Sequence, residues 1–388
     1  MFTLTFYYNI LKLKRQQNYS IIKLFEVIGD KNLKNIFVIY GGISVEHEVS
    51  ILSAQNVING LDRKKFKVFP LYIDKKGRFI SYGECKETIK DYNELKLEGT
   101  GTVSSSIAKF LQEDYKEGED NVFFPIVHGT YGENGELQGF LEIIDEPYVG
   151  NSVVSSAICM DKAFSNQLYE ENKIPQAKFR VMTNLSYEAD LKNKDEIIEY
   201  LGLPMFVKPC NSGSSIGITK VHNEGELEDA VLEALKFDNK ILLEEAVVGD
   251  ELQVSVIGNE NPIASLPGVS RVQQEFYNYE SKYFDDRTIH IVPFELEDGE
   301  TEKVQELAKK VYKLCNCSGF ARVDIFLRDS DRKMLVNEIN TAPGMTNHSM
   351  STMLWKVTDG TEFPQLLEKL IDYGIERYNK DKELIRLI

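Results

Sequence analysis

Apolar runs alternate with helical patterns in the first third of the chain. The first strong strand is predicted at residues 35–40, where it runs into two glycines and then a helix over 46–61 with its apolar residues on one face. A second apolar strand at 121–127 leads into another glycine-rich turn and a helix over 136–144. Strands that alternate with helices are typical of an α/β domain with a largely parallel sheet.

Two polar residues, Glu46 and His128, follow these two strands. Loops after the carboxyl ends of parallel strands build the binding sites of such sheets, so both side chains are predicted to lie at one site. Three residues after the dipeptide His47-Glu48 stands Ile51 and not histidine, so the zinc-protease pattern H-E-x-x-H is absent here.

From about residue 150 the pattern changes to an antiparallel α+β type, because two strands follow one another with only a small-residue loop between them. The predicted strands are 177–181, 203–209 and 216–221. The predicted helices are 160–172, 191–201, an amphipathic helix with apolar positions from 304 to 315, and a last helix over 364–378.

A pair of strands near residue 330 carries the most informative chemistry. Because side chains alternate along a strand, Arg322 and Asp324 share one face, and so do Glu338 and Asn340. A hairpin with its turn at 328–333 gathers the three oxygen ligands beside a guanidinium. Hard oxygen ligands without histidine or thiolate favour magnesium or manganese, usually completed by phosphate oxygens. A solvated hairpin face with ordinary ion pairs explains the same pattern about equally well.

The loop at 341–346 favours a ligand site over a solvated hairpin face. Its proline and Gly344 permit a close backbone approach to a ligand, and His348 and Ser349 stand where a helix is predicted to begin. Helix starts carry unpaired N–H groups that suit a carboxylate or a phosphate.

A second candidate phosphate site is the segment 208–217, where a strand ends in Lys208 and a loop of small polar residues follows. Small residues let backbone N–H groups surround phosphates, and the lysine supplies charge. No Walker loop and no dinucleotide-binding G-x-G-x-x-G after a strand occurs in the sequence. Residues 213–217 match the nucleophile elbow G-x-S-x-G, but that motif needs a helix where a strand is predicted, which disfavours a serine hydrolase.

Composition narrows the class of protein. The 388 residues are 42% hydrophobic and 27% charged, which is enough to build two or three folded domains. A formal net charge of −16 disfavours a nucleic-acid partner. The five cysteines are scattered, as in a reducing compartment, and the lone pair Cys315 and Cys317 fits core thiols better than zinc. We predict a cytoplasmic location and no membrane partner, because no apolar run reaches about 20 residues.

Seven motifs in chain order resemble the signatures of D-alanine:D-alanine ligases, members of the ATP-grasp superfamily. They are GGISVEHEVS at 41–50, HGTYGENGELQG at 128–139, MDK at 160–162, KPCNSGSSIG at 208–217, YESKY at 279–283, RVD at 322–324 and NEINTAPGMT at 337–346. The match runs from about residue 34 to the C-terminus. Residues 1–33 lie outside it and are interpreted as an extension that the fold does not need.

The resemblance implies a three-domain ATP-grasp fold of mixed α/β and α+β class, with ATP clasped between two antiparallel sheets. The implied domains are 34–150 (α/β substrate domain), 151–245 (central) and 246–388 (C-terminal, metal-binding). The implied reaction phosphorylates the carboxylate of one D-alanine with ATP, and the amine of a second D-alanine then displaces phosphate to give the dipeptide for peptidoglycan. A homodimer is implied by the family alone.

The resemblance also implies roles for individual residues. Lys162 and Lys208 are expected at the ATP phosphates, Glu244, Glu245 and Glu251 around adenine and ribose, and Asp324, Glu338 and Asn340 at two Mg²⁺ or Mn²⁺ ions. Glu46, with His128 and Ser214 nearby, is expected at the ammonium of the first D-alanine, and Lys282 and Ser349 at the carboxylate of the second. Arg322 and the Gly344 N–H are expected at the oxyanion. Tyr283 is expected in a lid over 279–286.

Two rival functions remain within this resemblance. A ligase of the same fold can join D-alanine to D-lactate or D-serine, and Tyr283 favours the dipeptide-forming members. An ATP-grasp protein without ligase activity is disfavoured by the intact set around Arg322. Glu245 is a departure from the family pattern, because many relatives carry lysine there, and it leaves the adenine contacts open.

Overall fold

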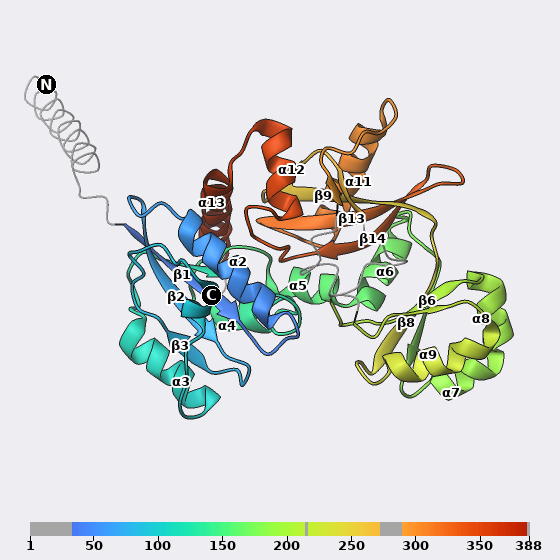
Figure 1. Ribbon diagram of the computed structural model, residues 1–388, viewed down its shortest axis with the longest axis horizontal. Helices are drawn as coiled ribbons and strands as arrows, with labels where there is room; N and C mark the ends of the chain where they lie inside the picture. The colour runs from blue at the N-terminus through green and yellow to red at the C-terminus, as the bar shows by residue number, and fades with distance from the viewer. Residues whose placement is uncertain (1–32, 214–215, 272–288, 386–388) are drawn as a thin grey trace, which may run out of the picture.

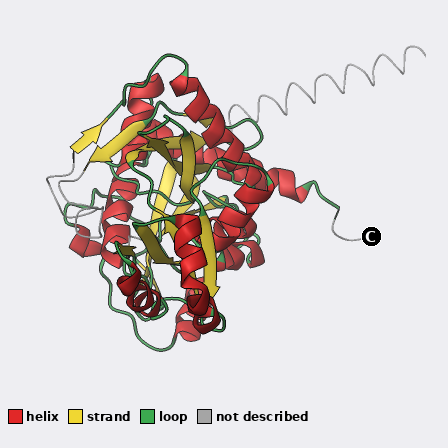
Figure 2. Cartoon of the chain, turned by 90° about the vertical axis from the view of Figure 1, so that its right-hand side faces the viewer, coloured by secondary structure: helices red, strands yellow, loops and turns green. Residues whose placement is uncertain are grey.

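The computed structural model describes residues 33–213, 216–271 and 289–385. The described chain contains three sheets with helices packed around them (Figure 1). Seen from the side, most helices lie outside the strands (Figure 2). The expected mixed α/β class is therefore confirmed.

The first sheet has the strand order β3-β2-β1-β4, in which β1 pairs in parallel with both β2 and β4. Its strands are β1 (Lys34–Gly41), β2 (Phe66–Ile73), β3 (Phe79–Ser81) and β4 (Asn121–Pro125), and its helices are α2 (His47–Gly60), α3 (Val103–Lys109) and α4 (Glu136–Ile143). Alternate residues of β1 enter two different apolar cores, Val38 on one face and Phe37 on the other. Apolar residues on both faces explain why this strand reads as a continuous hydrophobic run.

The second sheet is antiparallel, with the order β12-β11-β9-β13-β14 and β10 paired to β9. Its strands are β9 (Gly249–Ile257), β10 (Ile263–Ala264), β11 (Gly268–Arg271), β12 (Ile289–Ile291), β13 (Phe320–Arg328) and β14 (Met334–Asn340). The amphipathic helix α11 (Glu300–Leu314) packs on it through Val304, Ala308 and Val311, as its spacing predicts.

The third sheet is also antiparallel and has the order β5-β8-β6-β7. Its strands are β5 (Phe179–Thr183), β6 (Met205–Pro209), β7 (Thr219–Val221) and β8 (Lys240–Glu245), and its helices are α7 (Tyr187–Asp190), α8 (Lys194–Leu201) and α9 (Leu227–Ala234). The direct joining of β6 and β7 confirms the antiparallel arrangement inferred from the small-residue loop.

Four further helices of the described chain lie before the third sheet and after the last strand. They are α5 (Val153–Met160), α6 (Lys162–Glu171), α12 (Met350–Asp359) and α13 (Phe363–Lys382). Short turns of 3-10 helix are η1 (Tyr92–Leu95), η3 (Leu191–Asn193) and η4 (Glu224–Glu226), and η2 (Phe110–Asp114) is a π-helical turn. Leu366 and Leu370 of α13 share one core with β1, although they lie more than three hundred residues away in sequence.

Several predicted boundaries were wrong. The helix expected at 160–172 is α6, which begins only at Lys162, because the Asp161 carboxylate accepts from the N–H groups of Ala163 and Phe164 and caps its start. The preceding helix α5, which ends at Met160, was not predicted. The strand expected at 216–221 begins only at Thr219, and the one expected at 177–181 runs over 179–183. The last helix begins at Phe363 and extends to Lys382.

Among the described residues, no helix combines the length and the apolar character needed to cross a membrane. All five cysteines are free and buried, as core thiols are.

Candidate active site

The β13–β14 hairpin brings its polar residues together as predicted. Asp324 stands opposite Glu338, and Arg322 stands opposite Asn340. The Arg322 guanidinium donates to both Asp324 oxygens, at 2.7 Å from Nε and 2.6 Å from Nη2. Such a two-bond pair is the strongest arrangement available to these groups. Burial acts to lower the pKa of Arg322, but the neighbouring Asp324 carboxylate outweighs it and the net pKa is raised.

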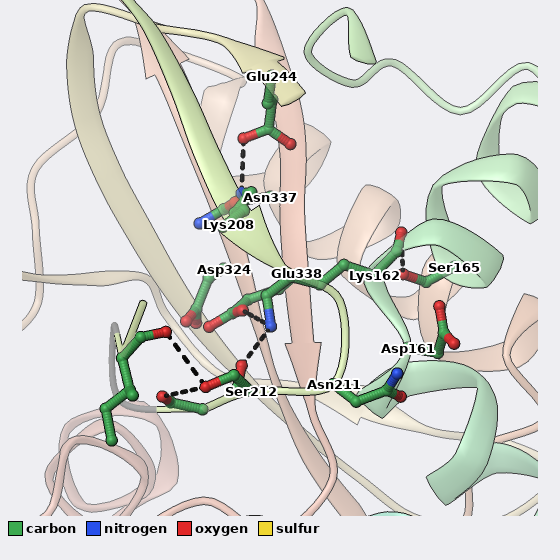
Figure 3. Close-up of polar contacts among 12 residues, drawn as sticks. Asp161, Lys162, Ser165, Lys208, Asn211, Ser212, Glu244, Asp324, Asn337 and Glu338 are labelled. Atoms are coloured by element: carbon green, nitrogen blue, oxygen red, sulfur yellow. Dashed lines mark hydrogen bonds and ion pairs between the residues drawn. The ribbon is translucent and has the colours of Figure 1, made fainter. Parts of the chain in front are cut away.

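Lys162 joins this hairpin from the start of α6. Its Nζ donates to the carbonyl oxygen of Ser212 at 2.8 Å and lies 3.7 Å from Glu338 Oε2. Figure 3 shows the lysine reaching between the loop after β6 and the Glu338 carboxylate. Three segments that are remote in sequence therefore meet around one carboxylate.

Lys208 and Glu244 form a buried ion pair on the third sheet. Nζ of Lys208 is 2.7 Å from Glu244 Oε2 (Figure 3). Desolvation acts to lower the pKa of Lys208, but Glu244 outweighs it and the pKa is raised. Glu251, on β9, accepts from Asn337 Nδ2 at 2.6 Å.

The Glu245 carboxylate has a local structural partner. It accepts from the backbone N–H of Lys178 at 2.9 Å, at the edge where β8 meets β5. The Glu245 carboxylate thus holds the backbone next to the start of β5.

Glu46 and His128 lie at the carboxyl ends of neighbouring parallel strands, which confirms the placement predicted from the glycine turns. Glu46 precedes α2 and is 5% exposed. The His128 ring is fixed at both nitrogens, with Nδ1 at 2.9 Å from the Ala342 carbonyl oxygen and Nε2 at 3.0 Å from Ser53 Oγ. A carbonyl can only accept, so Nδ1 carries the hydrogen and Nε2 accepts from Ser53. Burial lowers the pKa of His128, which is neutral at pH 7.

Sequence reasoning missed Glu133, which lies in the turn between β4 and α4. Its Oε1 accepts from the Gly129 N–H at 2.7 Å, and the residue is 9% exposed. Burial, followed by the charge of Glu46, raises the pKa of Glu133 to about 8. The only signal in the sequence is its place in the quoted motif at 128–139.

The loop after β14 closes the far side of the site. Ser349 stands at the N-terminus of α12, and its Oγ accepts from the Thr346 N–H at 2.8 Å. Gly344 lies beside it, since a Cβ built there would be 3.3 Å from Ser349 Oγ. The helix start predicted at His348 and Ser349 is therefore confirmed.

One cavity of about 280 Å³ gathers most of the predicted residues. Its lining includes Glu46, His128, Lys162, Glu251, Arg322, Asp324, Glu338, Asn340, Gly344 and Ser349, together with Glu133. Lys208, Glu244 and Glu245 are not among its lining residues. Ser214, Lys282 and Tyr283, and with them the lid expected at 279–286, lie outside the described residues.

The donor set of the hairpin fits a magnesium ion completed by phosphate oxygens. In the part of the chain that the structure describes, no group of three or more His, Cys, Asp and Glu side chains forms a metal site by itself. Asp324 and Glu338 supply two carboxylates, and the Asn340 amide oxygen accepts from the Ala342 N–H at 3.0 Å, which leaves it a second lone pair. Magnesium is usually bound in this way, by one or two carboxylates plus substrate phosphates.

Comparison with known proteins agrees with this geometry. The family model for the D-ala D-ala ligase N-terminus matches residues 35–151, and the model for the D-ala D-ala ligase C-terminus matches residues 168–372. The chain belongs to the D-alanine–D-alanine ligase family. A D-alanine–D-alanine ligase of Finegoldia magna is 43% identical over 90% of this chain and 98% of its own length. One of Halothermothrix orenii is also 43% identical, over 87% of this chain and 97% of its own length.

Solved structures of the family share the fold. The D-alanine-D-alanine ligase of Coxiella burnetii superposes with a TM-score of 0.73 at 32% identity, covering 91% of this chain and 98% of its own. The VanG D-Ala:D-Ser ligase of Enterococcus faecalis gives 0.74 at 31% identity, covering 88% and 100%. The Bacillus anthracis ligase complexed with ATP gives 0.70 at 26% identity, covering 90% and 99%. The expected ATP-grasp fold is thereby confirmed.

Proposed function

We propose that this chain joins two molecules of D-alanine to D-alanyl-D-alanine at the expense of ATP, for peptidoglycan synthesis, with the cavity described above as its active site. The observation that supports this most is the meeting of two unlike groups across that cavity. Arg322, Asp324 and Glu338 line one side, and Glu46 and His128 line the other. A side whose carboxylates would hold magnesium and its phosphates thus faces an acidic side that suits an ammonium group.

The first step transfers the γ-phosphoryl group of ATP to the carboxylate of the first D-alanine. Phosphoryl transfer depends on positioning and on cations more than on covalent groups. Lys162 has its ammonium 3.7 Å from Glu338, where it would meet the phosphates, and Lys208 serves ATP from the third sheet. Glu244 and Glu251 are proposed at the adenine and ribose. When bound at Asp324, Glu338 and Asn340, two magnesium ions would supply charge neutralisation for the phosphates.

The second step is attack by the amine of the second D-alanine on the acyl phosphate. We place the carboxylate of that D-alanine at Ser349 and the developing oxyanion between Arg322 and the Gly344 N–H. The fixed Arg322–Asp324 pair holds the guanidinium in place before the charge develops, so little reorganisation is needed. Ser214, Lys282 and Tyr283 retain the roles that the resemblance gives them.

The test follows phosphate release from ATP and identifies the product by mass. Release that requires both ATP and D-alanine, with D-alanyl-D-alanine as product, supports the proposal. Equal D-alanine, D-serine and D-lactate in competition distinguish the substrates, because one solved relative is a D-Ala:D-Ser ligase. Predominant D-alanyl-D-serine or D-alanyl-D-lactate at pH 7 contradicts the dipeptide assignment.

The finer features of the protein are also proposals. We propose magnesium as the physiological ion, a homodimer in solution, a cytoplasmic location, and domain limits at 150 and 245. Sedimentation at several concentrations tests the dimer, and limited proteolysis tests the domain limits.

A further inference from the structure

Glu133 lies in the active-site cavity but has no role in the mechanism above. Its carboxyl group is held by the Gly129 N–H at 2.7 Å and lines the same cavity as Glu46. The two carboxyl groups approach the same residue, because a Cβ built on Gly129 would lie 2.6 Å from Glu46 Oε2. Two buried acids therefore flank one glycine.

The cations and histidine near this acid pair have other partners. His128 Nδ1 is 4.0 Å from Glu133 Oε1, but its hydrogen is donated to the Ala342 carbonyl oxygen. Arg322 faces Glu133 from β13, but its guanidinium is engaged by both oxygens of Asp324. Glu338 faces it from β14 and adds negative charge. The charged groups that act most on Glu133 are thus two acids, Glu46 and Glu338, and one cation that Asp324 already engages.

Such surroundings favour the neutral form of the carboxyl group. Desolvation by burial and the charge of Glu46, partly offset by the Gly129 hydrogen bond, raise the pKa of Glu133 to about 8. A cation placed in the cavity beside Glu46 has the opposite effect, since an opposite charge within a few ångströms favours the ionised acid.

We propose that Glu133 and Glu46 together form a proton-linked binding site for the ammonium group of the first D-alanine, in which binding of the ammonium releases the carboxyl proton of Glu133. This inference rests on the proposed function. In the step, the O–H bond of the Glu133 carboxyl breaks, the proton passes to the buffer, and the carboxylate pairs with the substrate ammonium. No electrons are transferred.

A direct consequence is that protons compete with the first D-alanine. As the pH falls below about 8, the apparent affinity for the first D-alanine weakens by up to about tenfold per pH unit, because the proton must be displaced before the ion pair forms. The second D-alanine, which binds at the Ser349 end of the cavity, is not coupled to Glu133 in this way.

The experiment is titration calorimetry of the full chain with D-alanine at pH 7, in the presence of a non-hydrolysable ATP analogue. Two buffers with different ionisation enthalpies give the number of protons released. We expect the Glu133→Gln variant to release about one proton fewer than the parent, because glutamine keeps the acceptor for the Gly129 N–H but has no proton to lose. The matched control is Glu136→Gln, an exposed side chain three residues away, which should release as many protons as the parent.

A second measurement needs no variant. In the parent, proton release on binding should fall by most of one proton between pH 7 and pH 9, since Glu133 is already ionised at the higher pH. Equal release at both pH values, or equal release by parent and Glu133→Gln at pH 7, overturns the inference. Failure of the proposed function looks different, because the parent then shows no phosphate release that depends on D-alanine.

Discussion

Two acidic side chains that line the active-site cavity, Asp324 and Glu133, are stabilised in different ways. Asp324 pairs with Arg322, two positions away on the same strand face, through two short hydrogen bonds. Glu133 instead faces Glu46, and burial raises its pKa to about 8, so that it holds a proton at neutral pH. Asp324 thus has a fixed cationic partner, whereas Glu133 on the side built from the N-terminal loops responds to pH and to an incoming cation.

The largest effect is expected at Glu338, because the hairpin side of the site should lose its catalytic function when this charge is removed. Glu338→Gln keeps the shape of the side chain but removes one of the two carboxylates proposed to hold magnesium. Dipeptide formation should be abolished while the far-ultraviolet circular dichroism stays that of the parent. Activity close to that of the parent at subsaturating magnesium would contradict the metal assignment.

The next largest effect is expected for Arg322→Ala, which separates stabilisation of the oxyanion from binding of the nucleotide. Loss of one preorganised oxyanion donor raises the barrier by about 2.7–4 kcal/mol, so turnover should fall at least about a hundredfold. Nucleotide affinity, measured by calorimetry, should change much less. Arg322→Lys is the control that keeps the charge but loses the two-bond pair with Asp324. A loss of turnover below tenfold in the alanine variant would show that Arg322 has a structural role and does not stabilise the oxyanion.

A smaller effect is expected at Glu133, on the side of the site built from the N-terminal loops, where a substitution should raise the stability of the protein. The folded-state pKa of Glu133 lies above its unfolded value of about 4.5, so its contribution to stability is full below pH 4.5 and is lost as pH rises toward 8. Glu133→Gln, which cannot ionise, should therefore melt at a higher temperature than the parent at pH 8, with a smaller difference at pH 5. Thermal melts at both pH values check this. A parent that is the more stable at pH 8 would contradict the direction of the shift.

The smallest effect concerns Ser53, which orients the His128 ring. Ser53→Ala removes the hydroxyl that donates to Nε2 and leaves a buried acceptor without that partner, at a cost of about 1–3 kcal/mol. We expect a KM for D-alanine raised severalfold with kcat little changed, as measured by steady-state phosphate release. Ser53→Thr, which keeps the hydroxyl, should restore the parent value. An unchanged KM in the alanine variant would show that the orientation of His128 does not matter for binding.

Parts of the site that depend on one local element were predictable from the sequence. The alternation of side chains in β13 and β14 was enough to place Asp324 opposite Glu338, because the pleat of a strand has a fixed period of two. Glu46 and His128 were placed by a general property of parallel sheets. The start of α6 was predicted two residues too early, because the capping hydrogen bonds of the Asp161 carboxylate, which the structure shows, fix that start at Lys162.

The sequence by itself determined the strand, turn and helix units and the hairpin with its facing polar side chains, since each depends on residues close together in the chain. Only the tertiary structure decided that Lys162 reaches Glu338, that His128 donates to Ala342, and that Glu133 stands near Glu46. These three contacts join residues from separate parts of the chain, and in two of them the residues are more than a hundred positions apart. The pKa of Glu133 belongs to this second class for the same reason. Burial and neighbouring charges set it, and neither exists until the chain has folded.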